Sequence, residues 1–208
     1  MSSTQQDFFT VIQERHSVKV YDSNATMSEQ EITDLLEMAI KAPSSWNLQH
    51  WKFLAIHDPA EKEKLLPIAY NQQQVVQASV VIAVLGDLEA NKNAEAVFSS
   101  DVEAGILTEQ VKSGIIDQIE KAYTQPQLAR DEAIRNASLA AMQLMLAAKA
   151  QGYDTCPMGG YNAARLIDAF SIPSRYLPVM LIAVGKAAKP ARQTPRFPVD
   201  DIVVWNRF

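Results

Sequence analysis

The amino-acid sequence predicts one domain that combines helices with buried strands. Its 208 residues and hydrophobic content of 48% suit a single domain with a large core. Apolar runs at 51–56, 78–85 and 178–184, rich in β-branched residues, are typical of strands. Apolar residues at every third or fourth position elsewhere have the spacing of amphipathic helices. The prediction is therefore a mixed fold that a single core holds together.

The first two helices are predicted before residue 43. Apolar side chains recur with near-helical spacing from Thr4 to Arg15, so the chain is expected to open with an amphipathic helix. Ser28 and Glu31 have the spacing of a capping box, in which each side chain bonds the other residue's backbone N–H. The helix that follows is expected to stop before Pro43, because a residue that precedes proline avoids the helical conformation.

The segment between the second helix and the first strand is unusual. Residues 41–53 read KAPSSWNLQHWKF and combine serines, carboxamides and a histidine with two tryptophans. Large rings need burial and amides need hydrogen-bond partners, so ordinary loops rarely combine so many of both. The segment is predicted to form a ligand surface.

The next elements alternate between helix and strand. Asp58 and Pro59 are expected to cap and begin a short helix that runs to Ala69. Four carboxamides at 71–74 would usually form a surface turn. Residues 91–125 are polar and helix-compatible with one apolar stripe, which predicts a helical excursion or a lid.

A long helix is expected from Pro126 to Gln151, with Gly152 as its left-handed cap. Its part at 139–148 is apolar around nearly the whole circumference and is therefore expected to lie centrally in the core. Met142 and Met145 are interpreted as core filler rather than ligand contacts.

The end of the chain contains a turn, a short helix and a tail. Residues 156–161 (CPMGGY) predict a turn whose paired glycines permit positive φ and allow the backbone to approach a flat ligand, with a plain tight turn as the alternative. A short helix is expected at 162–170. The proline-punctuated tail at 186–208 is not expected to pack compactly on its own subunit, and its terminal apolar stretch could add a strand to another subunit's sheet.

Composition and motifs argue against several kinds of protein. A net charge of −5 has the wrong sign for binding nucleic acid. The single cysteine, Cys156, allows no intrachain disulfide, and no secretory signal is visible, so a cytoplasmic location is expected. The longest nearly apolar run is far too short to span a membrane, and His16, His50 and His57 lack metal-ligand spacing. The dinucleotide, P-loop and hydrolase motifs are also missing.

A cluster after the first helix has two interpretations. Arg15, His16, Ser17 and Lys19 could clamp a phosphate, since basic side chains supply charge-assisted donors and serine a neutral one. They could equally form a solvated helix end, where cations offset the helix dipole. Taken alone, the cluster favours the helix end.

Several short motifs, in their order along the chain, resemble the nitroreductase family of flavoproteins. The motifs are Arg15-His16-Ser17-x-Lys19, Pro43-Ser44-Ser45-x-Asn47-x-Gln49-x-Trp51, Asn71, Pro157-x-Gly159-Gly160 and Arg196. Each motif is weak alone, whereas their order and spacing together are specific and span almost the whole chain.

The resemblance implies an α+β sandwich with a mainly antiparallel central sheet flanked by helices. It also implies an intertwined homodimer that exchanges the C-terminal extension and holds two FMN molecules at its interface. In one subunit, the phosphate, ribityl chain and ring edge of FMN would be held by Arg15, His16, Ser17, Lys19 and Arg196. This assignment would overturn the helix-end interpretation.

The remaining site residues implied by the resemblance surround the flavin ring. The other subunit would contribute Pro43, Ser44, Ser45 and Asn47. Asn71 would bond the ribityl chain or ring edge, and Gln74 would lie beside the flavin. Backbone contacts near the reactive nitrogen would come from Pro157, Met158, Gly159 and Gly160.

The implied activity is an oxidoreductase reaction carried out on the flavin, with no catalytic side chain required. NADH or NADPH would reduce FMN, and a small-molecule acceptor such as a nitroaromatic or quinone would reoxidise it in a ping-pong cycle. Gln74 stands where some members carry a basic residue, and Gly159 where some carry an acidic one. The nicotinamide preference and the acceptor range are therefore left open.

Three alternatives stay open at this point. The first is another flavin reaction on the same fold, such as dehalogenation, azoline oxidation or flavin fragmentation. The second is a flavin-binding or redox-sensing protein whose turnover is incidental. The third is a helical structural protein without a cofactor, which would give a colourless preparation.

Overall fold

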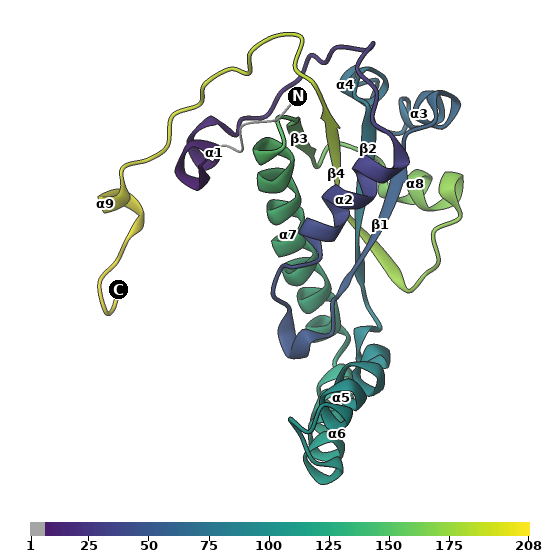
Figure 1. The fold of residues 1–208 in the computed structure, drawn as a ribbon, viewed down its shortest axis with the longest axis vertical. Coiled ribbons are helices and arrows are strands. Elements are labelled where there is room, and N and C mark those ends of the chain that lie inside the picture. The colour runs from purple at the N-terminus through teal and green to yellow at the C-terminus, as the bar shows by residue number, and fades with distance from the viewer. Residues whose placement is uncertain (1–6) are drawn as a thin grey trace.

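The computed structural model describes residues 7–208, and its centre is an antiparallel four-stranded sheet in the order β1-β2-β4-β3 (Figure 1). The strands are β1 (Trp51–Ile56), β2 (Val80–Asp87), β3 (Asp154–Met158) and β4 (Tyr176–Gly185). Every pair of neighbouring strands is antiparallel. The structure thus confirms the α+β class and three of the strands that the sequence predicts.

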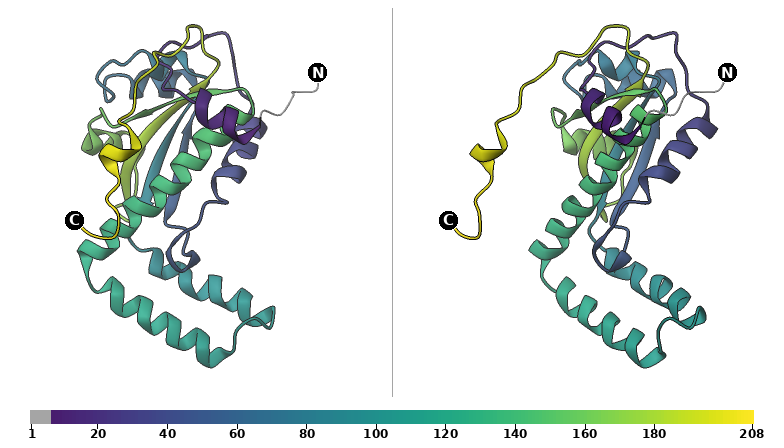
Figure 2. Two further views of the ribbon diagram at one scale, coloured as in Figure 1. Left: turned by 90° about the vertical axis from the view of Figure 1, so that its left-hand side faces the viewer. Right: turned by 60° about the vertical axis from the view of Figure 1, so that its left-hand side comes forward.

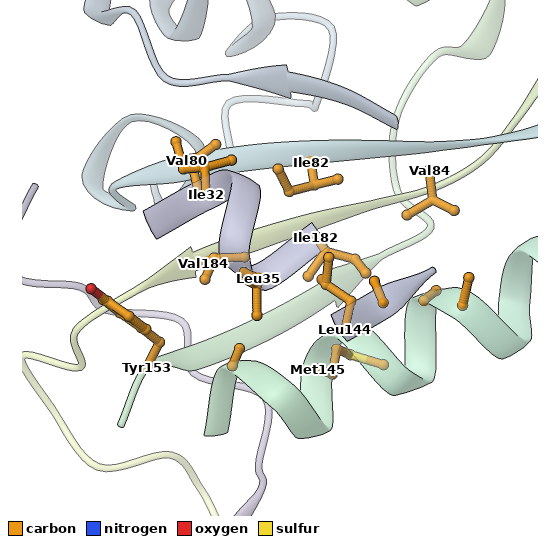
Figure 3. Close-up of a cluster of buried hydrophobic side chains, with 14 of the residues drawn as sticks. Ile32, Leu35, Val80, Ile82, Val84, Leu144, Met145, Tyr153, Ile182 and Val184 are labelled. Atoms are coloured by element: carbon orange, nitrogen blue, oxygen red, sulfur yellow. The ribbon is translucent and has the colours of Figure 1, made fainter. Parts of the chain in front are cut away.

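Each face of the sheet packs against helices, which explains why all of β2 is buried. Val80, Ile82 and Val84 lie on the face covered by α2 (Glu29–Ala39) and α7 (Pro126–Ala150), as Figure 3 shows. The alternate residues Val81, Ala83 and Leu85 belong to the second core cluster, with α3 (Pro59–Leu65) and α8 (Ala163–Phe170). Successive side chains of a strand point to opposite faces, so a strand covered on both sides reads as an unbroken apolar run.

Helix boundaries follow the capping signals. The Ser28–Glu31 capping box forms both of its hydrogen bonds, which confirms the predicted start of α2. Asp7 accepts from two backbone N–H groups at the start of α1 (Phe8–Glu14), while the predicted start at Thr4 lies outside the described residues. Gly152 adopts φ of +76° after α7, as its role as a helix terminator requires. The remaining helices are α4 (Gln74–Gln77), α5 (Ala94–Glu103), α6 (Glu109–Tyr123) and α9 (Val199–Ile202).

Two predictions about the second half are wrong. Residues 154–158 form strand β3, paired with β4, where the sequence predicted only a turn, and neither Gly159 nor Gly160 has a positive φ. Residues 139–148 do lie in the core, with Leu144 and Met145 buried, but Met142 is not core filler, because it is 40% exposed, and Leu139 beside it is 44% exposed. One face of α7 therefore leaves an apolar stripe uncovered in the single chain.

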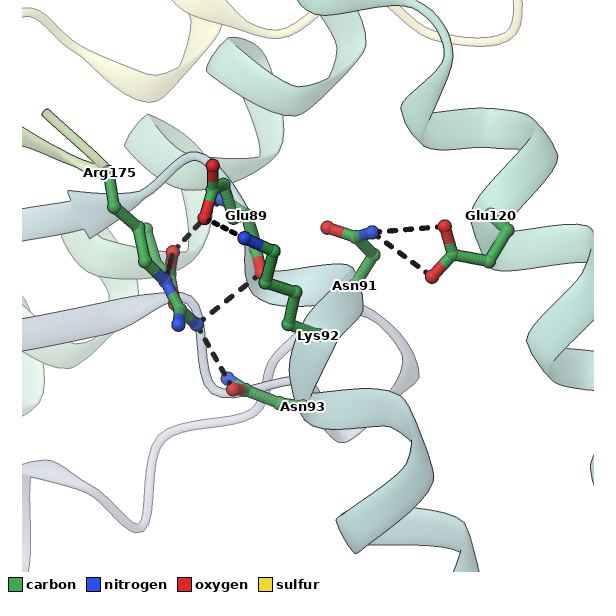
Figure 4. A network of polar contacts seen from close by, with 7 residues as sticks. Glu89, Asn91, Lys92, Asn93, Glu120 and Arg175 are labelled. Atoms are coloured by element: carbon green, nitrogen blue, oxygen red, sulfur yellow. Dashed lines mark hydrogen bonds and ion pairs between the residues drawn. The ribbon is translucent and has the colours of Figure 1, made fainter.

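The excursion predicted at 91–125 is helical and projects from one end of the sheet (Figure 2). We call residues 88–125 the helical arm. At its root Arg175 forms a two-pronged ion pair with the buried Asp87 (Nε–Oδ1 2.7 Å, Nη2–Oδ2 2.6 Å) and also donates to Asn93 Oδ1 (3.2 Å). A bond from Asn91 to both carboxylate oxygens of Glu120 then holds α6 to this root (Figure 4).

The tail beyond β4 leaves the body of the domain (Figure 1). Its start is paired, since Ala188 N–H donates to Val20 O (3.0 Å) and Tyr21 bridges Ala187. Beyond this pairing most of its large apolar side chains are at least half exposed: Phe197, Val199, Ile202, Val204, Trp205 and Phe208. In this single chain the tail forms the short helix α9, and the addition of the terminal stretch to another subunit's sheet stays a prediction. The tail does not pack compactly on its own domain, as predicted.

Candidate functional site

The basic cluster after α1 lines a cavity of about 480 Å³, here called the basic pocket. Its charged and hydroxyl side chains come from residues 15–19 and from the tail: Arg15, His16, Ser17, Lys19, Lys189, Arg192, Thr194 and Arg196. Segments from the two ends of the chain thus meet at one cavity. The structure brings Arg196 beside the residue 15–19 cluster, as the motifs imply.

Backbone hydrogen bonds and β-bridges hold these segments at the pocket. Ser17 forms a parallel bridge with Thr155 of β3, and Val18 N–H donates to Thr155 O (3.0 Å). The tail runs beside the same segment through the bridge between Tyr21 and Ala187. The cluster therefore begins at the C-cap of α1, Arg15, and continues between the edge of the sheet and the tail, so it is more than a helix end.

Five of the pocket side chains carry a permanent positive charge: Arg15, Lys19, Lys189, Arg192 and Arg196. Within residues 7–208 none of the five forms an ion pair with a carboxylate. Arg196 instead donates to the carbonyl and hydroxyl oxygens of Thr194, both at 2.8 Å. Unpaired like charges around one cavity repel one another and favour binding of an anion such as a phosphate monoester.

Cys156 lies in β3, close enough to the pocket residues Lys19 and Arg15 for their charges to act on its thiol. Burial raises the pKa of its thiol, although the charges of Lys19 and Arg15 act in the opposite direction. The side chain is only 3% exposed. A protonated, buried thiol fits the interpretation of Cys156 as apolar filler rather than a nucleophile.

The end of β3 meets the carboxamide segment. Gly160 O accepts from Gln72 Nε2 (2.7 Å), and Gln74 Nε2 donates to Gln72 Oε1 (3.1 Å). Asn71 adopts a left-handed φ of +58°, and its side chain is exposed. The prediction of an ordinary surface turn at 71–74 is wrong, because Gln72 ties this segment to the glycines and Gln74 is buried.

The residues from Pro157 to Gly160 differ in what they offer a ligand. The side chain of Met158 is 4% exposed and belongs to the core, so only its backbone could face a ligand. Pro157 lies in an edge strand, where the missing N–H costs no central ladder bond. A Cβ atom at Gly159 would have no neighbour within 4 Å, so the backbone there is open to close approach.

The predicted ligand surface at 41–53 contains a short 3₁₀ helix, Ser45–Asn47. We call residues 43–50 the Ser44 loop. Trp46, Asn47 and Gln49 all have left-handed backbone angles, with φ of +52°, +54° and +53°. Such angles strain residues other than glycine and persist only where surrounding contacts impose them.

Two α7 residues that the sequence analysis missed supply such contacts. Ser45 N–H donates to Asn136 Oδ1 (2.9 Å), and Ser45 Oγ donates to Glu132 Oε2 (2.5 Å). The hydroxyl of Ser44 accepts from Gln49 N–H (3.0 Å) and closes the loop. The sequence signal for these contacts was an amide, Asn136, among the alanines of a helix. Asn136 is only 1% exposed, and a buried amide requires hydrogen-bond partners.

Burial shapes the titration of two groups beside the loop. Burial raises the pKa of Glu132, but hydrogen bonds from Ser45 and Asn136 and the charge of Arg135 outweigh it and lower the pKa below its usual range. His50 is fully buried, and burial lowers its pKa. Neither of its ring nitrogens has a hydrogen-bond partner among the described residues. Its ring stacks on that of Tyr123, with 6.4 Å between the ring centroids.

The Ser44 loop and the basic pocket lie at different levels along α7. The loop contacts Asn136, near the middle of the helix, whereas His16 of the basic pocket also lines a neighbouring cavity with Lys149, near the end of the helix. At about 1.5 Å per residue these two positions on α7 are roughly 20 Å apart.

In the part of the chain that the structure describes, no group of three or more His, Cys, Asp or Glu side chains is arranged to hold a metal ion. None of the helices at 7–208 combines the length and apolar character that a membrane span needs.

Comparison with known proteins gives consistent matches over nearly the whole chain. The model of the Nitroreductase family matches residues 12–186. YodC of Bacillus subtilis, provisionally named an NAD(P)H nitroreductase, is 52% identical over 195 residues, which are 94% of this chain and 96% of that protein. A CLA biosynthesis enone reductase from Lactiplantibacillus plantarum is 32% identical over 196 residues, which are 92% of this chain and 90% of that protein.

A solved structure agrees with these sequence matches. A protein of Exiguobacterium sibiricum, provisionally named a nitroreductase and crystallised in complex with FMN, superposes with a TM-score of 0.92 at 38% identity. The match covers 99% of this chain and 100% of the other.

Proposed function

This chain belongs to the nitroreductase family, and from that premise we propose that it is an FMN-dependent oxidoreductase that transfers electrons from NADH or NADPH to a small-molecule acceptor. The named relatives support the nicotinamide donor, and the FMN complex of the Exiguobacterium sibiricum protein supports the cofactor. When bound, FMN would supply the electron chemistry, accepting a hydride from the nicotinamide and giving two electrons to the acceptor.

The single observation that carries this proposal is the basic pocket. Five permanent cations without a carboxylate partner in residues 7–208 surround a cavity that the Ser17 hydroxyl also lines. This donor set suits the dianionic phosphate of FMN. The residues that would hold the phosphate end are Arg15, His16, Ser17, Lys19 and Arg196.

The ring end of the cofactor would meet a different surface. Asn71 and Gln74 would contact the ribityl chain or ring edge, and the Gly159 backbone is open to a flat ring. Gly160 is already held by Gln72, so this part of the site is preorganised by the chain itself. The role of these side chains is to bind and orient, and no acid or base is assigned to them.

We propose that the working unit is a homodimer in which the Ser44 loop of one copy completes the site of the other. The position of the loop, roughly 20 Å from the end of α7 beside α1, supports this arrangement. Exposed apolar side chains on α1, α7 and the tail would be covered by the second copy: Phe8, Phe9, Ile12, Leu139, Met142 and Trp205. The site residues carried over from the family and the cytoplasmic location stay predictions.

The visible spectrum of the purified protein tests the cofactor assignment. We expect the absorbance of oxidised flavin, its loss on anaerobic addition of NADH or NADPH, and its recovery when an acceptor is added. A colourless protein that cannot be reconstituted with FMN would contradict the proposal and favour a structural role. Full FMN occupancy with negligible turnover would favour flavin binding or redox sensing instead.

A second acceptor class is favoured by the L. plantarum relative. Its name assigns it the reduction of an enone, which is a carbon–carbon double bond conjugated to a carbonyl. Comparing kcat/KM for a nitroaromatic, a quinone and an enone would rank these acceptors. An enone rate well above the other two would identify the alternative, whereas a quinone or nitroaromatic preference would support the main proposal.

A further inference from the structure

The strained conformation of the Ser44 loop must be imposed by contacts with the rest of the protein. Trp46, Asn47 and Gln49 are left-handed within four consecutive positions, and none is a glycine. Burial of the Trp46 ring does not impose that conformation, because the residue is 38% exposed. Neighbouring residues must therefore impose this conformation.

The residue just before the left-handed segment is held from α7. Both polar groups of Ser45 bond to that helix, its N–H to Asn136 Oδ1 and its hydroxyl to Glu132 Oε2. Asn136 Nδ2 in turn donates to Glu132 Oε2 (2.8 Å) and to Glu132 O (2.7 Å). The same carboxylate thus supports the loop directly and through Asn136.

One residue within the left-handed segment and one just after it are held by the root of the helical arm. Asn93 Nδ2 donates to Leu48 O (2.8 Å), and Asp87 N–H donates to His50 O (3.0 Å). Leu48 itself is fully buried. With both flanks fixed, the short segment between them has little freedom to leave the strained conformation.

The Glu132 carboxylate is suited to holding the loop in its strained conformation. Its Oε2 accepts from Ser45 and Asn136, while Oε1 pairs with Arg135. The lowered pKa of Glu132 keeps it ionised near neutral pH, so these are charge-assisted hydrogen bonds. A carboxamide of the same shape could accept only on one oxygen and would lose part of the network.

We propose that Glu132, acting with Asn136 through Ser45, is a positioning residue that sets the left-handed backbone of the Ser44 loop and thereby the affinity of the flavin site. The step from loop to flavin rests on the proposed function, in which this loop faces the cofactor. The step from Glu132 to the loop stands on the contacts alone.

The test compares Glu132→Gln with Asp131→Asn. Both variants convert one carboxylate of α7 to a carboxamide, but Asp131 is exposed and bonds only Gln127 on its own helix. The dissociation constant of FMN is measured by fluorescence titration of flavin-free protein. We expect a rise of about tenfold for Glu132→Gln, the scale of one charge-assisted hydrogen bond, and less than about twofold for Asp131→Asn.

A second measurement follows the loop without any cofactor. The chain has 3 tryptophans, so 5-fluorotryptophan labelling gives few ¹⁹F resonances, and Trp46→Phe assigns that of the loop. We expect the Trp46 resonance of flavin-free protein to shift or broaden in Glu132→Gln and to keep its position in Asp131→Asn.

The outcomes test the step from Glu132 to the loop separately from the step from the loop to the flavin site. An unchanged Trp46 resonance in Glu132→Gln overturns the proposal, even if FMN binding is weaker. A shifted resonance with unchanged FMN affinity overturns the link to the flavin site. Wild-type protein that binds no FMN contradicts the proposed function, and the resonance alone then decides the role of Glu132. If Glu132→Gln does not fold, Ser45→Ala removes the same hydroxyl contact and takes its place in both measurements.

Discussion

The basic pocket and the Ser44 loop use similar residue types in opposite ways. In the pocket, five cationic side chains form no ion pair with a carboxylate among residues 7–208, so their charge is available to a ligand. In the loop, Ser45 directs both its N–H and its hydroxyl to α7, and Ser44 accepts from the loop's own backbone. One region offers its polar groups, and the other uses them to hold a strained backbone.

This difference shows how a binding motif can be misinterpreted. A serine beside a ligand can contact it, or it can fix the chain that does. The two roles predict different results on mutation. Changes in the loop and its supports should reduce the stability of the free protein as well as ligand affinity, whereas changes in the pocket should reduce ligand affinity and leave the free protein as stable as before.

The largest expected effect lies on the supporting side of the loop. Arg175→Ala would leave Asp87, whose side chain is 4% exposed, without its ion pair at the root of the helical arm. Because the Arg175 side chain is 28% exposed and water can enter, we expect a loss of about 3 kcal/mol in the free energy of unfolding, measured by urea denaturation. The control is Lys92→Ala, which breaks only a surface pair with Glu89 and should cost less than about 1 kcal/mol. Equal losses in both variants would show that the buried pair does not support this region.

The next effect tests the pocket. Arg15→Ala should weaken FMN binding by about 1.5–3 kcal/mol, or roughly 10- to 150-fold, because one charge-assisted contact is lost. Its unfolding free energy should not fall, since the change relieves repulsion among like charges.

The matched control for Arg15→Ala is Arg130→Ala, the same change at an exposed position of α7. It should leave FMN affinity unchanged. If Arg15→Ala bound FMN as tightly as the wild type, Arg15 would have no place in the site.

The smallest expected effect concerns pH. His50 is buried with a lowered pKa, so between the ordinary value of 6.5 and that lowered value the unfolded chain takes up a proton that the folded ring does not. The stability contribution is therefore present above pH 6.5 and is lost as the pH falls, by at most about 1.4 kcal/mol per pH unit. His50→Leu should remove this slope between pH 7 and about 5, as measured by urea denaturation at a series of pH values.

Two further results bear on the His50 prediction. His50→Leu should cost little stability at neutral pH, because neither ring nitrogen has a partner in the described residues to lose. His57→Leu, at an exposed position, should keep the wild-type slope. A slope that survives in His50→Leu would place the titrating group elsewhere.

Local chemistry made much of the fold predictable. The capping box at Ser28 and Glu31, the proline at the start of α7 and the left-handed Gly152 each fix a helix end through bonds within a few residues. Strand β3 was not predictable in this way. It is a five-residue edge strand that contains Pro157, and its pairing is imposed by β4, more than 20 residues later in the chain.

The candidate site was predictable only where a motif is compact. Arg15 to Lys19 form one cluster, but Arg196 joins them through the path of the tail, which no local pattern encodes. Glu132 and Asn136 were missed for the same reason. Their partner Ser45 lies about 90 residues away in sequence, and an acidic residue on a helix otherwise indicates only a solvated face.

The exposed tail has a consequence for how much protein must be present. Its apolar side chains, among them Phe197, Ile202 and Trp205, gain nothing from hydrophobic burial in a single chain. If a second copy covers them, that free energy is released only on association, and the melting temperature of this protein rises with its concentration. Diluting the protein would then lower its stability, and its concentration in the cell would set the fraction of chains that stays folded.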